Sequence, residues 1–182
     1  VMLRRPPRSA LFPDATLFRS PRHLEWSRAL AEAQESHGHH VARLVYANWL
    51  AGTRVIDIEA EVSAAAELAG PLDRPVVVAK SIGTVIATLA IGRRLIQPAG
   101  EVFLGLPLEA FENDPEAVGY LPKLPPVTVV QNEDDPFGSA EKAREFVSAH
   151  APRQWRFETI PAVNTHDYVD SDAIERWVEE HI

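Results

Sequence analysis

The stretch 75–91, PVVVAKSIGTVIATLAI, constrains the fold most, because its pattern predicts a buried strand followed by a tight turn and a helix. Residues 75–79 are apolar and mostly β-branched, which is typical of a parallel strand covered on both faces. From Thr84 onward, apolar side chains recur at helical spacing. The turn carries Ser81, so the sequence predicts a serine at the carboxyl end of a strand and the start of a helix.

Small residues flank this serine, with Ala79 two positions before it and Gly83 two positions after it. The pattern A-x-S-x-G matches the nucleophile elbow, usually written G-x-S-x-G. Such a turn strains the serine backbone, leaves little room for flanking side chains and raises the hydroxyl above the sheet. The first amides of the helix would then face a developing anion. The alternative is an ordinary helix start, in which Ser81 caps amides two or three residues further on.

Composition restricts the class of protein. With 182 residues, 46% of them hydrophobic, the chain has enough apolar side chains for one domain with one core. A net charge of −8, with no basic stretch outside the N-terminus, argues against nucleic acid or an anionic membrane as partner. The absence of cysteine excludes a disulfide framework. The longest apolar run is too short to span a membrane, so we expect a soluble, cytoplasmic protein.

The first 20 residues differ in character from the rest, being basic and proline-bearing. Residues 11–20, LFPDATLFRS, resemble LFPYTTLFRS, the peptide obtained by translating a common sequencing adapter, and differ from it only at Asp14 and Ala15. We therefore expect residues 1–20 to be a non-native or disordered leader and residues 21–182 to be the folded domain. A genuine basic leader is the alternative.

Strand and helix patterns alternate along the rest of the chain. Helices are predicted over about 24–36, 57–69, 84–91, 139–150 and 171–181, and strands over 41–46, 75–79, 101–104, 127–130 and 155–160. Residues 111–125 lack sustained periodicity and are predicted to be a loop. This alternation predicts an α/β fold with a mostly parallel sheet and helices on both faces.

Three candidate functional residues follow predicted strands: Ser81, Asp135 and His166. Ligands of open parallel sheets bind at the carboxyl ends of the strands. The chain order Ser, Asp, His is the order that α/β-hydrolases use. Residues 131–138, QNEDDPFG, resemble the acid loop Q-G-x-x-D-P-F-G of one branch of that family. Over residues 21–182 the chain therefore resembles an α/β-hydrolase, of the small, capless, dienelactone-hydrolase-like kind.

The resemblance implies a three-layer sandwich and a serine hydrolase that cleaves ester or thioester bonds of a small acyl substrate through an acyl-enzyme. In that family's scheme Ser81 would be the nucleophile, His166 the general base and Asp135 the carboxylate that orients the imidazole. The backbone amide of Ile82 would supply one oxyanion donor. The family's chemistry needs no cofactor and no metal. The sequence leaves the oligomeric state undetermined.

Several assignments keep an alternative. Asp134 could replace Asp135 as the acid. Lys80 could bind an acidic group of the substrate, or extend across the strand end into solvent. Trp49 could line the substrate pocket or pack at its rim. The stretch 36–40, SHGHH, favours a polar turn over a metal site, because no carboxylate or cysteine near it is spaced for ligation.

One part of the family pattern is missing. The resemblance implies a strand and an oxyanion loop before the helix at Leu24, often carrying His-Gly or Pro-Gly, but the adapter-like run stands there. Loss of the strand would open a gap of roughly 9 to 10 Å in the sheet, unless residues 10–18 fill it. We therefore expect a chain without the N-terminal strands that is weakly active or inactive, although its ancestor was a hydrolase. The alternative function is a non-catalytic scaffold of the same fold that binds a ligand or partner.

Overall fold

Six parallel strands form one sheet in this structure, a computed structural model that describes residues 9–14, 22–50, 52, 55–151, 154–168 and 171–180. The strand order is β2-β1-β3-β4-β5-β6. The strands are β1 (Ser9–Asp14), β2 (His40–Val45), β3 (Val76–Lys80), β4 (Gly100–Leu104), β5 (Val127–Asn132) and β6 (Arg156–Ile160). The predicted fold class, a parallel sheet between helical layers, is confirmed.

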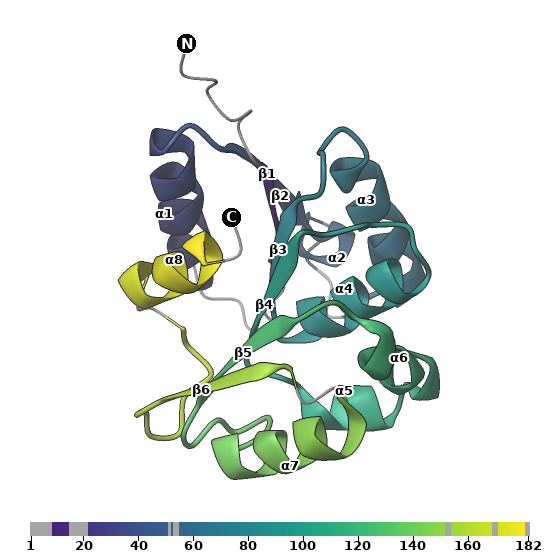
Figure 1. The fold of residues 1–182 in the computed structure, drawn as a ribbon, viewed down its shortest axis with the longest axis vertical. Helices are drawn as coiled ribbons and strands as arrows, with labels where there is room; N and C mark the ends of the chain where they lie inside the picture. Colours follow the sequence, from purple (N-terminus) through teal and green to yellow (C-terminus); the bar gives the residue numbers. More distant parts are fainter. Residues whose placement is uncertain are drawn as a thin grey trace.

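Helices cover both faces of the sheet (Figure 1). One face carries α1 (Arg22–Ser36) and α8 (Ser171–Glu179), and the other carries α3 (Ile58–Ala69), α4 (Ile82–Gly92) and α7 (Ala140–His150). The shorter helices are α2 (Ala47–Leu50), α5 (Leu108–Glu112), α6 (Pro115–Tyr120) and the 3-10 helix η1 (Leu121–Lys123). No helix in the described ranges combines the length and the apolar character needed to cross a membrane.

The strand that leads to Ser81 is buried over its whole length. Val76 and Val78 pack on the side of α1 and α8, while Val77 and Ala79 pack on the side of α3 and α4. All four are at most 1% exposed. Fully burying one valine side chain contributes about 1.5 to 3 kcal/mol, so burial between two helical layers favours the apolar run from Val76 to Ala79. This burial fixes the end of β3, and with it the position of the serine.

Strand β1 lies at the position where the sequence predicted a missing strand. It pairs in parallel with β2 on one side and with β3 on the other, and Asp14 is in register with both Val45 and Lys80. Of the two outcomes considered, an open gap or a gap filled by the leader, the structure has the second, with residues 9–14 in place. The remainder of the predicted leader, 1–8 and 15–20, lies outside the described residues, and the leader's boundary and origin stay predictions.

The predicted loop over 111–125 is wrong, because this segment contains the end of α5, all of α6 and η1. The side chain of Asp114 caps α6 by accepting a hydrogen bond of 2.9 Å from the amide of Ala117, and Pro115 follows at the first helical position. Both residues are helix-start signals. The helices have only five or six residues, too few to establish a period, and this explains the error.

Two predicted helix starts are confirmed. Asp57 caps α3, with its carboxylate accepting from the amide of Ala60 at 3.1 Å. Ser139 caps α7, with its hydroxyl accepting from the amide of Lys142 at 3.4 Å. The α7 cap follows the acid loop directly, so it fixes where that loop ends.

Candidate active site

Ser81 is the whole turn between β3 and α4, because β3 ends at Lys80 and α4 begins at Ile82. Its backbone has φ 53° and ψ −130°, a conformation that costs a non-glycine residue of order 1 to 3 kcal/mol. Its side chain makes no capping hydrogen bond, so the interpretation of Ser81 as an ordinary helix cap is wrong. The serine is 2% exposed.

Backbone hydrogen bonds hold this strained turn in place. The amide of Ser81 donates to the carbonyl of Leu104 at the end of β4, at 2.9 Å. The carbonyl of Ser81 accepts from both the amide and the hydroxyl of Thr84, each at 2.8 Å. Ala79 and Gly83 are buried beside it, as the need for small flanking residues predicts. The local structure therefore has the geometry expected of a nucleophile elbow.

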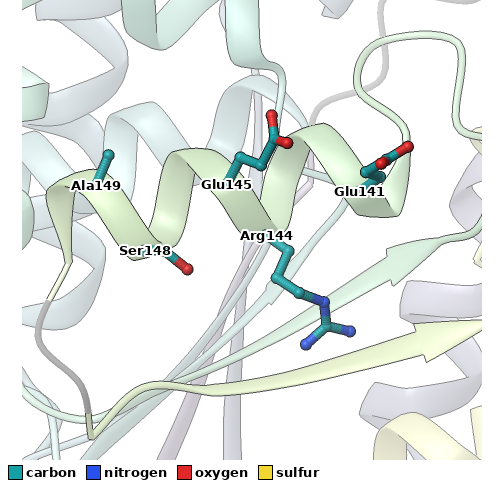
Figure 2. Close-up of a pocket in the computed structure, with 5 residues that line it drawn as sticks. All are labelled: Glu141, Arg144, Glu145, Ser148 and Ala149. Atoms are coloured by element: carbon teal, nitrogen blue, oxygen red, sulfur yellow. The ribbon is translucent and has the colours of Figure 1, made fainter.

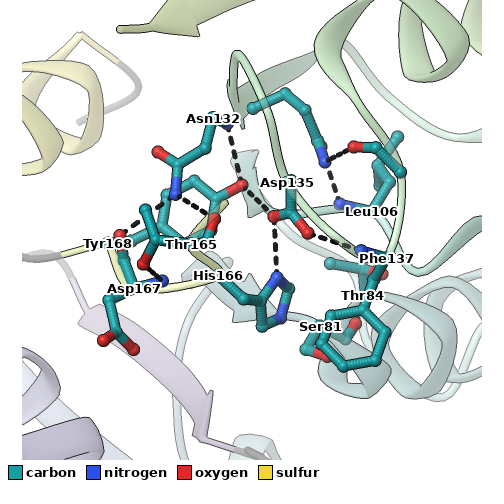
Figure 3. A network of polar contacts seen from close by, with 12 residues as sticks. Ser81, Thr84, Leu106, Asn132, Asp135, Phe137, Thr165, His166, Asp167 and Tyr168 are labelled. Carbon is teal, nitrogen blue, oxygen red and sulfur yellow. Dashed lines mark hydrogen bonds and ion pairs between the residues drawn. The ribbon is translucent and has the colours of Figure 1, made fainter. Parts of the chain in front are cut away.

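Asp135 and His166 form a buried pair near the ends of β5 and β6 (Figure 3). His166 Nδ1 lies 2.7 Å from Asp135 Oδ2. The same carboxylate accepts from the Phe137 amide, through Oδ1 at 2.9 Å, and from the Tyr168 hydroxyl, through Oδ2 at 2.9 Å. The ring of Phe137 packs edge-on against the imidazole, with the centroids 4.8 Å apart. Three donors thus hold the carboxylate in one orientation.

The alternative acid, Asp134, faces away from this pair. Its side chain is exposed, and its Oδ2 accepts a hydrogen bond of 3.2 Å from the amide of Asn164. Asp135 is 3% exposed and makes the contact to His166. Of the two candidates, Asp135 is therefore the carboxylate that the fold brings to the histidine.

The end of β4 links the serine to the histidine. Leu104 accepts the hydrogen bond from Ser81, and the next residue, Gly105, has φ 66°. A Cβ atom at Gly105 would lie 2.7 Å from His166 Cε1 and 2.8 Å from Tyr168 Cε2, so both rings pack directly on this glycine. Ser81 and the imidazole therefore contact the same two-residue segment, 104–105. Figure 3 shows the Ser81 side chain close to the His166 ring.

The other imidazole nitrogen, Nε2 of His166, is buried and makes no hydrogen bond within the described part of the chain. Hydrogen bonds between a catalytic base and its nucleophile are often long or unformed without substrate. Because Nδ1 faces the carboxylate, Nε2 is the nitrogen left to accept a proton. The arrangement can therefore support proton transfer at Nε2.

Two amide side chains that the sequence analysis did not assign a role hold the loops around the pair. Gln131 accepts from the amide of Leu106 at 2.8 Å and donates to the carbonyl of Gly138 at 2.6 Å, which ties the β4 loop to the acid loop. Asn132 donates through Nδ2 to two carbonyl groups of the histidine loop, those of Thr165 at 3.0 Å and Asp167 at 3.1 Å. The sequence signal that could have found these residues is the pair of amide side chains, Gln131 and Asn132, at the end of a mainly β-branched strand.

The predicted substrate-binding residues have different outcomes. Lys80 is fully buried, and its Nζ lies 5.8 Å from the centre of the Tyr168 ring, so the alternative in which it extends into solvent is wrong. A contact between Lys80 and substrate stays a prediction. Trp49 belongs to α2, but its side chain lies outside the described residues. Ile82 is the first residue of α4, which is where an oxyanion donor would be needed.

The histidine-rich turn before β2 pairs with α8. His37 Nδ1 lies 3.5 Å from Glu175 Oε1 and 3.4 Å from Glu179 Oε1, and His39 Nε2 lies 3.8 Å from the latter oxygen. Within the described residues no group of three or more metal-binding side chains is placed to hold an ion. The turn therefore joins α1 and β2 to α8 through these histidine–glutamate contacts.

A separate pocket lies on the outer face of α7 (Figure 2). All five lining residues belong to this one helix: Glu141, Arg144, Glu145, Ser148 and Ala149. Arg144 is held against β6, with Nη2 donating to Thr159 Oγ1 at 3.1 Å and the guanidinium over the Phe157 ring at 4.3 Å. None of the three candidate catalytic residues lines this pocket, so it is distinct from the site at the strand ends.

Comparison with solved structures identifies the fold. A protein from Xanthomonas campestris, whose solved structure is named as a hydrolase of the alpha/beta superfamily, matches with a TM-score of 0.66 and 17% identity. The match covers 96% of this chain and 95% of that one. The esterase domain of a Rhodothermus marinus protein matches at 0.68 and 14%, over 95% and 86%. A monoacylglycerol lipase of Paleococcus ferrophilus matches at 0.68 and 11%, over 97% and 96%. No protein-family model and no curated protein matches the sequence.

These structures are α/β-hydrolase superfamily members, and the chain has their fold. At identities of 17% and below, the similarity establishes the arrangement of sheet and helices. The resemblance to the dienelactone-hydrolase-like branch and the proposed loss of N-terminal strands stay predictions.

Proposed function

We propose that the chain is a serine hydrolase that cleaves an ester or thioester bond of a small acyl substrate through an acyl-enzyme. Ser81 is the nucleophile, His166 takes its proton through Nε2, and Asp135 orients the imidazole and stabilises the imidazolium. A serine hydroxyl is a weak nucleophile near neutral pH, so the reaction needs a base beside it and a carboxylate behind the base.

One observation carries the proposal. The buried Asp135–His166 pair and the strained Ser81 turn are at the carboxyl ends of strands in one parallel sheet, and both adjoin the Leu104–Gly105 segment. Strained backbone concentrates at functional sites, and an imidazole oriented by a carboxylate is the base that a serine nucleophile needs. If the Ser81 turn had only a structural role, it would not need a buried Asp135–His166 pair beside it. The presence of both at one place therefore supports a catalytic role.

The substrate class is proposed from the solved structures with this fold. An esterase domain, a monoacylglycerol lipase and the thioesterase domain of the curacin biosynthetic pathway are among them. All three names denote cleavage of an acyl group from oxygen or sulfur. Acyl transfer of this kind is also the chemistry that a serine–histidine–carboxylate set performs.

Stabilisation of the oxyanion is where we expect this chain to be weak. The amide of Ile82, at the start of α4, supplies one donor. In the family that the chain resembles, a second donor comes from the loop after the strand at the sheet position that β1 occupies here, and residues 15–20, ATLFRS, carry neither His-Gly nor Pro-Gly. Loss of one such donor typically lowers kcat by about 100- to 1,000-fold. We therefore propose an impaired hydrolase, with activity that is measurable but low.

Hydrolysis of p-nitrophenyl butyrate, a short activated ester, tests this proposal. We expect slow turnover that is lost in Ser81→Ala and retained in Ser148→Ala, which removes an exposed hydroxyl on α7. Equal rates for the unmodified chain and Ser81→Ala would contradict the proposal. Hydrolysis lost equally in both variants would also contradict it, because Ser148 has no role in the proposed site.

The second candidate is a non-catalytic scaffold that binds a ligand or partner. The observation that favours it is the absence of a hydrogen bond between His166 Nε2 and Ser81 in the described structure. A scaffold would not need this bond, whereas an enzyme forms it in the substrate complex. A serine-directed covalent inhibitor distinguishes the two, since a scaffold has no activated hydroxyl to react.

A further inference from the structure

Tyr168 makes two hydrogen bonds through one buried hydroxyl at the candidate site. The hydroxyl donates to Asp135 Oδ2 at 2.9 Å and accepts from the backbone amide of Asn132 at 3.0 Å. The residue is 1% exposed. Burial, followed by the charge of Asp135, raises the pKa of Tyr168 above its ordinary value, so the phenol stays protonated and remains a donor. Because Asn132 belongs to β5, this hydroxyl is fixed by the sheet itself.

The same carboxylate oxygen receives both the tyrosine and the histidine. Asp135 Oδ2 accepts from the Tyr168 hydroxyl and contacts His166 Nδ1 at 2.7 Å, while Oδ1 accepts from the Phe137 amide. Rotation of the carboxylate about its last bond would break all three contacts. Without the tyrosine hydroxyl, the side of the carboxylate that faces the imidazole would be held only by the imidazole.

The tyrosine ring also contacts the imidazole directly. The rings of Tyr168 and His166 are nearly perpendicular, at 89°, with their centroids 5.8 Å apart. Both rings pack on Gly105, where a Cβ atom would come within 2.7 Å of the imidazole and 2.8 Å of the tyrosine ring. The hydroxyl therefore acts on the pair from a ring that is itself immobilised.

We infer that Tyr168 is a positioning residue, whose hydroxyl orients Asp135 and thereby fixes His166 for proton transfer. Its hydroxyl bonds Asp135 and the backbone amide of Asn132, so in this scheme its effect on the reaction passes through the aspartate. The kinetic part of this inference rests on the proposed function. The positional part concerns only the Asp135–His166 contact, and it can be measured in a protein that performs no catalysis.

The positional part is tested by proton NMR on Ser81→Ala, which removes the nucleophile and leaves Tyr168, Asp135 and His166 unchanged. We expect a downfield resonance for the His166 Nδ1 proton, and a cross-peak between it and a Tyr168 hydroxyl proton protected from exchange. Adding Tyr168→Phe should shift the Nδ1 resonance and speed its exchange about tenfold or more. A missing cross-peak, or a resonance unmoved by Tyr168→Phe, would overturn the inference. The cross-peak is measured with Tyr168 intact, so this part of the test does not depend on whether the Tyr168→Phe variant folds.

The kinetic part compares Tyr168→Phe with Tyr120→Phe, a half-buried tyrosine on α6 that packs against Gly92. We expect Tyr168→Phe to lower kcat about tenfold, the equivalent of one hydrogen bond, with KM within about twofold. Tyr120→Phe should leave both constants unchanged. A Tyr168→Phe variant that keeps its kcat overturns the inference, as does one that changes KM alone.

The two proposals fail in different ways. If the unmodified chain hydrolyses no ester and reacts with no serine-directed inhibitor, the proposed function fails, and the NMR measurement on Ser81→Ala still decides the positional inference. If the chain is active and Tyr168→Phe changes neither kcat nor the Nδ1 resonance, the positional inference fails and the proposed function stands. Thermal unfolding of each variant separates both results from loss of the fold, since Tyr168→Phe leaves the buried Asn132 amide without its acceptor.

Discussion

His166 Nδ1 lies 2.7 Å from Asp135 Oδ2, with both side chains buried at the carboxyl end of a parallel sheet. The two residues are 31 positions apart and reach this contact because β5 and β6 are neighbouring strands that end at the same edge. The contact directs one imidazole nitrogen to the carboxylate and leaves the other for proton transfer. The mechanism that we propose depends on this orientation.

Asp135→Asn should lower kcat for ester hydrolysis about 1,000-fold or more, because the amide cannot hold the imidazole in the required tautomer. The matched control is Asp134→Asn, one residue away. Asp134 is exposed and bonds the amide of Asn164, and an asparagine oxygen can replace that acceptor, so its rate should change by less than about threefold. Steady-state kinetics of both variants checks this. A larger loss in Asp134→Asn would reverse the assignment of the acid.

The strained turn predicts an unusual effect on stability. Ser81 has φ 53°, which glycine adopts without strain, whereas alanine bears the same strain as serine. We expect Ser81→Gly to be more stable than Ser81→Ala by about 1 kcal/mol, measured by urea unfolding. An ordinary N-cap would also favour glycine over alanine, but there the unmodified serine would be the most stable of the three. Relief of strain at a serine that makes no capping hydrogen bond predicts instead that Ser81→Gly is more stable than the unmodified chain. Finding alanine the more stable variant would contradict the strained geometry.

Gly105 should be intolerant of a methyl group. It has φ 66°, and a Cβ atom there would meet His166 and Tyr168 at 2.7 and 2.8 Å. We expect Gly105→Ala to lower the free energy of unfolding by about 2 kcal/mol or more, from backbone strain and overpacking together, and to lower kcat as the imidazole shifts.

The matched control for this glycine is Gly119→Ala in α6, where a Cβ atom meets nothing within 4 Å. Alanine is the better helix former, so this variant should be as stable as the unmodified chain or more so by up to about 1 kcal/mol. Urea unfolding measures both variants. Equal effects at the two glycines would contradict the packing of the histidine loop on β4.

The sequence predicted the parts of the site that rest on local patterns. The strand, small residues and helix around Ser81 define the elbow, and the segment DDPFG places an acid after β5. The sequence could not distinguish Asp134 from Asp135, because two adjacent carboxylates differ only in which way the turn directs them. That direction is set by contacts to Asn164 and to His166, about 30 residues further on.

Other features depended on contacts between distant segments. The hydroxyl of Tyr168 reaches Asp135 across 33 positions, and a tyrosine two residues after a histidine has no pattern that would reveal it. For Lys80 the sequence left two alternatives, a contact with the substrate or extension into solvent. The second is wrong, because the residue lies within a strand that is buried from end to end, beside the Tyr168 ring. The placement of β1 also required the sheet, since residues 9–14 resemble neither a continuous apolar run nor an alternating one.

Glu101 predicts a dependence of stability on pH. It lies on β4, fully buried, and within the described residues neither carboxylate oxygen has a hydrogen-bond partner. Burial raises the pKa of Glu101 well above its ordinary value of 4.5. The folded chain therefore retains this proton at pH values where the unfolded chain has released it. The contribution of the Glu101 carboxyl to the free energy of unfolding is fully present below about pH 4.5. It declines as the pH rises toward the raised pKa.

Glu101→Gln removes this titration while keeping the shape of the side chain. Relative to the unmodified chain, the variant should gain stability from about pH 4.5 upward, by about 1.4 kcal/mol per pH unit until the pKa of Glu101 in the folded chain is reached. Urea unfolding at pH 4.5, 6 and 8 measures the difference. Glu67→Gln, on the exposed side of α3, should show no such trend. A difference for Glu101→Gln that is constant with pH would contradict a buried, protonated carboxyl.

The most direct test of the proposed mechanism is reaction of the unmodified chain with a fluorophosphonate, followed by mass spectrometry of the labelled peptide. We predict one covalent adduct on Ser81, formed more slowly in Asp135→Asn and absent in Ser81→Ala. Ser148→Ala should label at the unmodified rate. A chain that folds but acquires no adduct, or acquires it at another serine, would contradict the assignment of Ser81 as an activated nucleophile.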